Sequence, residues 1–222
     1  MSSRTAYHET RLPFDRRREV LWRSLWKYRF SRYVEASDCV LELGSGYSHF
    51  INNVQSAKRI AIDIWPGFLD YLDPGVQGHI GAVTDLDVIK DGSVNFAFAS
   101  NLVEHMSQDA FGRLLDQLKQ KLARRSRVAF LQPNYRYAFR EYFDDYTHVT
   151  VYSHLSLCDF LRAHGFEIVE CIPRFLPLTI KSRFKVWPVL IWLYLHSPIK
   201  PLGKQMLVVA RVAETHGEVV GP

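Results

Sequence analysis

A short apolar run that ends in an acidic residue and two glycines constrains the fold of this chain more than any other stretch. The run spans residues 39–46 with the sequence CVLELGSG, and Phe50, Ile51 and Val54 follow it at helical spacing. This order predicts a buried strand, a tight turn and a helix that reaches about Val54. Glycine permits the turn and lets a ligand approach the backbone, while the first N–H groups of the helix lie beside it.

A second apolar run, residues 59–63, ends in the carboxylate of Asp63, nineteen residues after Gly44. In open α/β sheets, a carboxylate about 20 residues beyond the glycine turn commonly holds a nucleotide ribose. Ligands of such sheets bind at the carboxyl ends of the strands. The two runs together therefore predict a nucleotide-type site at one edge of a parallel sheet.

The residues around the turn favour S-adenosylmethionine over a dinucleotide. A dinucleotide fingerprint has a third glycine, but Ser48 and His49 occupy that region, so a pyrophosphate would lose its closest backbone approach. The carboxylate of Glu42, two residues before Gly44, would also repel a pyrophosphate. It suits an ammonium or sulfonium cation instead.

Four motifs in order then resemble the class I S-adenosylmethionine-dependent methyltransferases. They are Glu42-Leu-Gly44-Ser-Gly46, Asp63, Asp85-Leu86 and the stretch 100–105, SNLVEH. The resemblance covers roughly residues 36–212, and the missing third glycine is its one departure. It implies a three-layer, Rossmann-like α/β fold: a seven-stranded, mostly parallel sheet with an antiparallel last strand and helices on both faces.

The resemblance also implies roles for individual residues in binding S-adenosyl-L-methionine. Glu42 would face the methionine amino group or the turn backbone, and Asp63 would accept both ribose hydroxyls. Asp85 and the Leu86 backbone would read the adenine amine, although Asp87 and Asp91 are close rivals of Asp85. Asp63 has a simpler alternative as a solvated strand-end carboxylate. The expected cofactor-binding residues are Glu42, Gly44, Gly46, Asp63, Ile64, Asp85, Leu86 and Asn101.

The loop after the fifth expected strand, residues 132–148, carries the densest chemistry. It holds aromatic, basic and acidic side chains that no core requires, and loops of this kind commonly carry binding and catalysis. His148 is the best candidate for a general base because its ordinary pKa lies near neutral pH. Asp145 or Asp144 could orient His148 or act in its place, and a turn histidine bonded to backbone is the alternative. A metal site is not expected, because two adjacent carboxylates point apart on most backbones.

Charge divides the chain into a mildly acidic body and two basic additions. Residues 1–34 have a balance of +6, residues 35–173 one of −6, and residues 174–204 hold six basic side chains and no acid. We expect a basic helical extension over 1–35, a methyltransferase domain over 36–213 and a flexible tail over 214–222. The insertion 174–204 also contains a Trp/Leu/Tyr-rich run too short to span a bilayer. It suits either peripheral contact with a membrane surface or a lid over the acceptor.

The remaining elements follow from apolar periodicity and turn residues. A helix is expected over 14–35, with Trp22 and Trp26 covering the core or forming part of a substrate lid. A clear turn is expected at residues 65–67 and an irregular loop at 67–78. Further strands are expected near 79–80 and at 94–99, 128–131, 166–171 and 205–212, and helices at 108–124 and 155–164.

The function expected from these features is methyl transfer to a small-molecule, glycan or lipid-linked acceptor, most simply a hydroxyl. No Pro-Pro-Tyr-type signature of amide or nucleobase methylation is present. A non-catalytic methyltransferase-like binding subunit and a nucleotide-dependent oxidoreductase are the alternatives. Three cysteines without paired spacing and a start without an apolar region favour a cytoplasmic protein. Nucleic acid is a disfavoured partner, and the sequence leaves the oligomeric state open.

Overall fold

A seven-stranded sheet forms the centre of the protein in the computed structural model, which describes residues 15–177 and 187–214. The strand order is β3-β2-β1-β4-β5-β7-β6. Strands β1 to β5 run parallel, whereas β7 runs antiparallel to both of its neighbours, β5 and β6. The expected fold class, a mostly parallel sheet with an antiparallel last strand, is confirmed.

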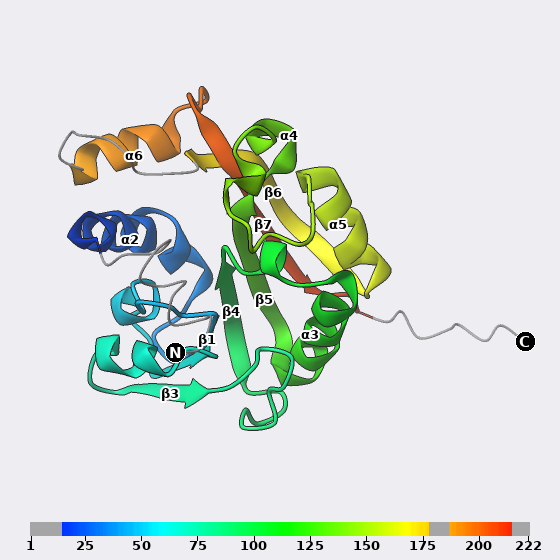
Figure 1. Ribbon diagram of the computed structural model, residues 1–222. Coiled ribbons are helices and arrows are strands. Elements are labelled where there is room, and N and C mark those ends of the chain that lie inside the picture. Colours follow the sequence, from blue (N-terminus) through cyan, green and yellow to red (C-terminus); the bar gives the residue numbers. More distant parts are fainter. Residues whose placement is uncertain (1–14, 178–186, 215–222) are drawn as a thin grey trace, which may run out of the picture.

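The elements alternate along the first two thirds of the chain, and a strand pair closes it (Figure 1). The strands are β1 Cys39–Leu43, β2 Lys58–Asp63, β3 Val76–Ile80, β4 Val94–Ser100, β5 Leu122–Pro133, β6 Phe166–Pro177 and β7 Gly203–Val212. The α-helices are α2 Arg16–Tyr28, α3 Gln108–Lys121, α4 Tyr135–Ala138, α5 His154–Ala163 and α6 Pro188–His196. Short 3₁₀ helices are η1 Phe30–Tyr33, η2 Ile51–Asn53, η3 Pro66–Tyr71, η4 Val103–His105 and η5 Tyr142–Asp144.

Both faces of the sheet are covered, which explains why the central strands are apolar without alternation. All five residues of β1 are buried, although one of them is Glu42. Continuous apolar strands are typical of parallel sheets that carry helices on both faces. The strand residues therefore divide between two core clusters, one on each side.

The first core cluster lies between the sheet and helices α3 and α5, which Figure 1 shows together on one side. Helix α3 contributes Phe111, Leu114, Leu115 and Leu118, the positions that its apolar periodicity predicts. They pack against alternate strand residues such as Leu41, Ile60, Ala97 and Val128. This packing holds the carboxyl ends of four neighbouring strands at one level.

The second core cluster lies on the opposite face, under α2 and three 3₁₀ helices. Leu25 and Trp26 of α2 are buried in it, and Trp22 packs edge-on against Phe50 and Phe98. Both tryptophans, Trp22 and Trp26, thus belong to the core rather than to a lid. Edge-to-face aromatic pairs of this kind add about 0.5–1.5 kcal/mol beyond the area that they bury.

The expected helix after the glycine turn is wrong, because only the single turn η2 forms there. The asparagines of this stretch bind backbone groups and so compete with helix formation. The Asn53 side chain donates to the His49 carbonyl, and Asn52 bridges to Tyr71 and Asp73. The site therefore has no long helix N-terminus pointing at it from this position.

Other expected boundaries also need correction. Helix α2 ends at Tyr28 instead of residue 35, because Arg29 leaves helical backbone angles before η1 begins. Helix α3 ends at Lys121, and Leu122, expected in its buried stripe, starts β5 instead. Residues 65–72 are also more regular than a turn and loop, since η3 begins at Pro66, and β3 is longer than expected.

The basic insertion is shorter than expected, since β6 continues to Pro177 and β7 begins at Gly203. Helix α6 lies within it and packs beside α2 (Figure 1). Because β6 runs parallel to β5, the insertion leaves the sheet at the edge where β1, β4 and β5 end. Lys181, Arg183 and Lys185 of this insertion, like residues 1–14 and most of the tail, lie outside the described residues.

Helix α6 is apolar on most sides, yet it spans only Pro188–His196. Among the helices of residues 15–177 and 187–214, none has the length and apolar character needed to cross a bilayer.

Candidate active site

The glycine turn follows β1 and contacts the end of β2 and the loop after β4. Gly44 and Gly46 have φ angles of +69° and +51°, in the left-handed region that glycine adopts without strain. The Gly44 N–H donates to the Ile62 carbonyl at 2.9 Å. A Cβ atom on Gly44 would lie 3.0 Å from the Leu102 side chain, in the loop after β4. Glycine is therefore needed here both for the backbone conformation and for the close approach of the two loops.

Glu42 is buried beneath this turn and is hydrogen-bonded to it. One carboxylate oxygen accepts hydrogen bonds from the Ser45 hydroxyl at 2.7 Å and from the Ile51 N–H at 3.2 Å. Burial raises the pKa of Glu42 to about 8, and the nearby charge of Asp63 acts in the same direction. Of the two expected roles for Glu42, contact with the turn backbone is the one seen in the structure.

Asp63 lies at the end of β2, where the sequence placed it, and is almost fully buried. One carboxylate oxygen accepts from the Gly46 N–H at 2.7 Å, and the other accepts from the Trp65 N–H at 2.8 Å. Each oxygen keeps a second lone pair that can accept a hydroxyl. The side chain of the next residue, Ile64, is exposed beside it. The glycine turn and this carboxylate thus form one hydrogen-bonded cradle.

Three aromatic rings next to this cradle were not singled out by the sequence analysis. The Tyr47 ring centroid lies 5.4 Å from that of Trp65 and 4.7 Å from that of Tyr71, both edge-on. Gly67 allows this arrangement, because a Cβ there would lie 2.5 Å from the Trp65 ring. An aromatic residue two positions after the ribose-type carboxylate was the available sequence signal.

Asp85 and Leu86 are engaged elsewhere. The Leu86 side chain is fully buried in the first core cluster, and its N–H donates to the Gln117 side chain on α3 at 3.2 Å. Asp85 is exposed and accepts from the Asp87 N–H at 3.3 Å. The hydrogen bonds of this pair therefore lead to α3 and the local loop, not to the glycine turn.

Asn101 caps the end of β4 in a left-handed conformation, with φ +48°. Its N–H donates to the Leu131 carbonyl at 2.8 Å, and its side-chain oxygen accepts from Gln205 of β7 at 2.9 Å. The residue is exposed at the edge where β4 and β5 end. These bonds fix its position between the turn after β1 and the loop after β5.

Main-chain hydrogen bonds attach the loop after β5 to η4, the short helix after β4. The N–H groups of Val149 and Thr150 both donate to the Glu104 carbonyl, at 2.9 and 3.2 Å. The Thr150 hydroxyl donates to the Met106 carbonyl at 2.5 Å. This attachment brings His148 next to His105, with ring centroids 4.8 Å apart.

His148 is half-buried, with its Nδ1 2.5 Å from the Tyr142 carbonyl oxygen and its ring packed against the Tyr142 ring. The expected orienting acids, Asp145 and Asp144, lie in the same loop as His148. The Asp145 carboxylate accepts from the Thr147 N–H at 3.0 Å and from its hydroxyl at 2.6 Å, and Thr147 in turn contacts His105. Asp144 is exposed at the end of η5. Asp145 therefore acts on His105 through Thr147.

Glu104 is the main residue of the site that sequence reasoning missed, although it lies inside the fourth motif. It is 1% exposed, and within the part of the chain that the structure describes neither carboxylate oxygen has a hydrogen-bond partner. Burial raises its pKa to about 8, with a smaller contribution from Asp145. One ligand atom each from Glu104, His105 and His148 lie within 4.8 Å of one another. The Glu-His pair directly after β4 was the available signal.

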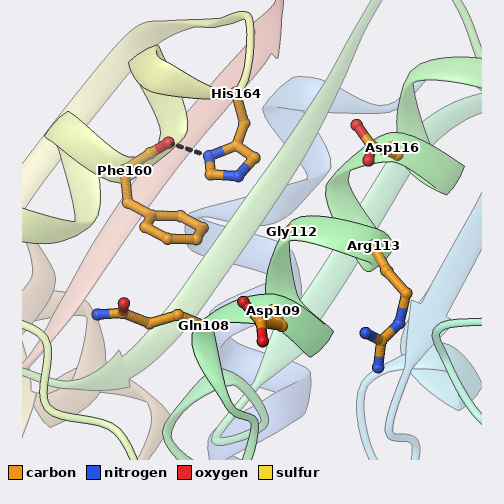
Figure 2. A pocket seen from close by; sticks show the side chains of 7 residues that line it. All are labelled: Gln108, Asp109, Gly112, Arg113, Asp116, Phe160 and His164. Atoms are coloured by element: carbon orange, nitrogen blue, oxygen red, sulfur yellow. Dashed lines mark hydrogen bonds between the residues drawn. The ribbon is translucent and has the colours of Figure 1, made fainter.

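Two surface hollows lie away from these residues. Figure 2 shows the first, a hollow of about 430 Å³ between α3 and α5, where the His164 ring bonds the Phe160 carbonyl and faces Gly112. The second, of about 760 Å³, lies beside α2 and η2 and is lined by Arg23, Lys27 and Arg59 among others. None of the candidate cofactor or catalytic residues lines either hollow.

The fold and the cradle at its carboxyl edge are those of a class I methyltransferase. A family model described as a methyltransferase domain matches residues 14–171. The chain therefore belongs to the methyltransferase-domain family, and its expected membership in the S-adenosylmethionine-dependent class is confirmed. S-adenosyl-L-methionine is the cofactor of that class.

Solved structures support the fold at low sequence identity. A S-adenosylmethionine-dependent methyltransferase from Archaeoglobus fulgidus has 19% identity and a TM-score of 0.66, with 95% of this chain and 99% of that chain covered. A chain from the complex of the Haloferax volcanii Trm112 methyltransferase activator has 17% identity, a TM-score of 0.67 and coverages of 96% and 95%. Geranyl diphosphate C-methyltransferase from Streptomyces coelicolor has 12% identity, a TM-score of 0.59 and coverages of 84% and 76%. A comparison with curated proteins by sequence gave no match.

Proposed function

We propose that this protein is an active enzyme that transfers a methyl group from S-adenosylmethionine to a hydroxyl of a small-molecule, glycan or lipid-linked acceptor. The observation that carries the proposal is the position of His148. A half-buried imidazole is fixed beside the loops that follow β4 and β5, at the same sheet edge as the Gly44–Asp63 cradle. A non-catalytic binding subunit would have no use for such a group.

At the cofactor end, we propose that the residues of the cradle bind the nucleoside. The remaining lone pairs of Asp63 would accept the ribose hydroxyls, and Gly44, Gly46 and Ile64 would line the approach. Bound S-adenosylmethionine supplies a methyl group already activated by its sulfonium, so the protein contributes mainly alignment. Glu42 would stabilise the turn through its hydrogen bonds to Ser45 and Ile51. For Asp85, Leu86 and Asn101, cofactor contact stays a prediction, which for Asp85 and Leu86 requires the loop of residues 81–90 to rearrange.

At the acceptor end, His148 is the proposed general base. Its Nδ1 lies on a carbonyl oxygen, which can only accept, so Nδ1 carries the proton and Nε2 the lone pair in the neutral ring. Bound S-adenosylmethionine would supply the methyl group to the acceptor oxygen and leave as the neutral thioether, and Nε2 of His148 would take the hydroxyl proton. Asp145 would be a positioning residue that acts through Thr147 on His105. Asp144 remains a weaker candidate to orient His148 or to act as the base in its place.

Helix α6 supports a second part of the proposal, contact with a membrane surface. Ile191 faces the core, while Trp187, Leu190 and Leu193 are more than half exposed on the outside of the same helix. Large apolar side chains gathered on one exposed surface often mark an interaction site, and this one lies on a chain segment rich in basic residues. An enzyme for lipid-linked acceptors would use such a helix at the interface. The cytoplasmic location stays a prediction.

Vesicle sedimentation tests the membrane contact. The protein should pellet with phosphatidylglycerol-containing vesicles at low salt and less with pure phosphatidylcholine vesicles. Leu190→Ser with Leu193→Ser should abolish pelleting, whereas Val88→Ser with Val169→Ser, two exposed positions elsewhere, should not. Absence of pelleting by the wild type at low salt would assign α6 to an acceptor lid and favour a soluble acceptor.

Cofactor binding and turnover test the main proposal. Calorimetry should give a measurable affinity for S-adenosylhomocysteine and none for NAD, which separates the enzyme from an oxidoreductase. Radiolabelled S-adenosylmethionine with glycan and lipid fractions should then label an acceptor. Binding of S-adenosylhomocysteine without labelling of any fraction would favour the non-catalytic subunit, and binding of NAD alone would overturn the proposal.

A further inference from the structure

Three side chains that could share one metal ion meet beside the proposed acceptor position. Glu104 and His105 belong to η4 after β4, and His148 belongs to the loop after β5. One ligand atom from each lies within 4.8 Å of the others. Metal–nitrogen and metal–carboxylate bonds of about 2.0–2.2 Å bring ligand atoms to roughly 3–3.5 Å of one another. The most distant of these atoms therefore need to approach one another by about 1.3–1.8 Å to hold one ion.

The state of Glu104 is an independent observation that points to a ligand. Its side chain is 99% buried, and both oxygens are without a hydrogen-bond partner among the described residues. A buried carboxylate without a partner costs several kcal/mol of solvation, so proteins normally supply a cation, a donor or a proton. A cation held between Glu104 and the two imidazoles would supply what this carboxylate lacks.

The hydrogen bonds of the two histidines fix which ring nitrogen of each carries the lone pair. In His148, Nδ1 donates to the Tyr142 carbonyl, so Nε2 carries the lone pair. In His105, Nδ1 lies 2.9 Å from the Thr147 hydroxyl, whose own proton goes to Asp145. The hydroxyl must therefore accept from Nδ1, and Nε2 of His105 carries the lone pair as well. A carbonyl or carboxylate-linked group behind the far nitrogen is the usual outer support of a histidine that binds metal.

We propose that Glu104, His105 and His148 form a binding site for a divalent first-row transition-metal ion. Two imidazoles and one carboxylate are ligands typical of Zn²⁺, Fe²⁺, Co²⁺ or Mn²⁺, whereas Mg²⁺ and Ca²⁺ favour sites made wholly of oxygen. Three protein ligands leave at least one position for water or substrate. The expectation of no metal site, argued from the Asp144–His148 run alone, did not consider residues of η4.

The site would change the route of the proton, and this consequence rests on the proposed function. Nε2 of His148 cannot hold a cation and accept a proton at the same time. With the ion bound, an acceptor hydroxyl in the open position would be acidified by the metal, and its proton would pass to solvent. Direct proton transfer to His148 and metal assistance therefore differ in one measurable property, dependence on the ion.

Metal binding is best measured without any assay of activity. The full-length protein, stripped with chelator and dialysed, should bind one Zn²⁺ or Co²⁺ by calorimetry, and Co²⁺ should give visible absorption from a site of nitrogen and oxygen ligands. Glu104→Gln should weaken binding by at least about 100-fold, because loss of even outer supports costs about 10–100-fold. Glu35→Gln and His79→Ala, away from the site, should bind as the wild type does.

The outcomes separate the two proposals. Equal Zn²⁺ affinity in Glu104→Gln and wild type, or no binding of any of the four transition ions by the stripped wild type, would overturn the metal site. If Glu104→Gln fails to fold, His105→Gln provides the same comparison. Binding of S-adenosylhomocysteine is measured on the same stripped samples. Loss of S-adenosylhomocysteine binding with metal binding intact would overturn the proposed function alone. Retention of S-adenosylhomocysteine binding without metal binding would overturn the metal site alone.

Discussion

The two ends of the candidate active site treat their buried polar groups in opposite ways. At the cofactor end, the carboxylates of Glu42 and Asp63 both accept hydrogen bonds from the turn that they support. At the acceptor end, Glu104 and Gln132 are buried with side-chain polar atoms that bond to nothing in the described chain. The first arrangement stabilises the free protein, while the second costs stability until a ligand arrives. The polar groups at the cofactor end therefore have their hydrogen-bond partners before any ligand binds. Those at the acceptor end would gain partners only from a ligand.

The largest effect is expected at the acceptor end. His148→Ala should slow turnover by about 10²–10⁴-fold, the usual contribution of a general acid or base, and leave the affinity for S-adenosylhomocysteine nearly unchanged. Single-turnover kinetics with labelled cofactor and calorimetry provide the two measurements. His79→Ala on β3 is the control. Near-normal turnover in His148→Ala would return this residue to a purely structural role in the turn.

A pH-dependent loss of stability is expected at the cofactor end. Burial raises the pKa of Glu42 to about 8, above the value of about 4.3 for an exposed glutamate. Between these values the folded state binds more protons than the unfolded state, so this group makes stability fall as pH rises. The slope is at most about 1.4 kcal/mol per pH unit.

Glu42→Gln isolates this contribution. Urea unfolding of both proteins between pH 5 and pH 8, without cofactor, gives the difference in free energy of unfolding. The free energy of unfolding of the wild type should fall relative to that of Glu42→Gln as the pH increases, because the amide does not titrate. A difference that stays constant over this window would show that Glu42 is ionised throughout, held by a cation near the turn.

A smaller effect is expected for the ribose contact. Asp63→Ala removes charge-assisted hydrogen bonds and should weaken S-adenosylhomocysteine binding by roughly 10- to 100-fold, or about 1.5–3 kcal/mol. Asp70→Ala, an exposed aspartate in the neighbouring η3, should bind normally. Unchanged affinity in a folded Asp63→Ala protein would remove Asp63 from the cofactor site. Because Asp63 also accepts from Gly46, circular dichroism should accompany the measurement.

The smallest expected effects are changes in the free energy of unfolding, and they test the contrast between the two ends of the site most directly. Gln132→Met replaces a buried amide without partners by an apolar group of similar size and should raise the free energy of unfolding by about 1 kcal/mol. Ser45→Ala, which removes the hydroxyl that donates to Glu42, should lower it by about 1 kcal/mol. Chemical unfolding of both variants gives the two signs. Two changes of the same sign would mean that the ends of the site do not differ in this way.

The sequence placed the glycine turn and Asp63 correctly because these features are local. A glycine turn after an apolar strand and a carboxylate after the next strand are adjacent once the strands pair in parallel, and the register places Leu41 beside Ile60 and Ala97. The helix predicted after the turn does not form, because asparagine side chains compete for its backbone groups. Asp85 and Leu86 were assigned from a motif, whereas core packing directs Leu86 toward α3.

The acceptor end was harder to predict because it depends on contacts between distant segments. His148 was found from the composition of its loop, but His105, whose ring it contacts, lies more than forty positions earlier in the chain. The Glu-His pair after β4 carries no spacing signal that distinguishes a ligand from an ordinary loop. Hydrogen bonds between the two segments, such as those from the Val149 and Thr150 N–H groups to the Glu104 carbonyl, bring the three side chains together.

Those same bonds bear on how relatives of this protein could diversify. Val149 and Thr150 reach the Glu104 carbonyl through their backbone N–H groups, which every residue except proline provides. The stretch 135–141 lies upstream of this attachment and can accumulate substitutions, or exchange whole segments with another gene, while His148 keeps its place. New acceptors could then evolve by variation in one short exon-sized piece, with the reactive centre inherited intact.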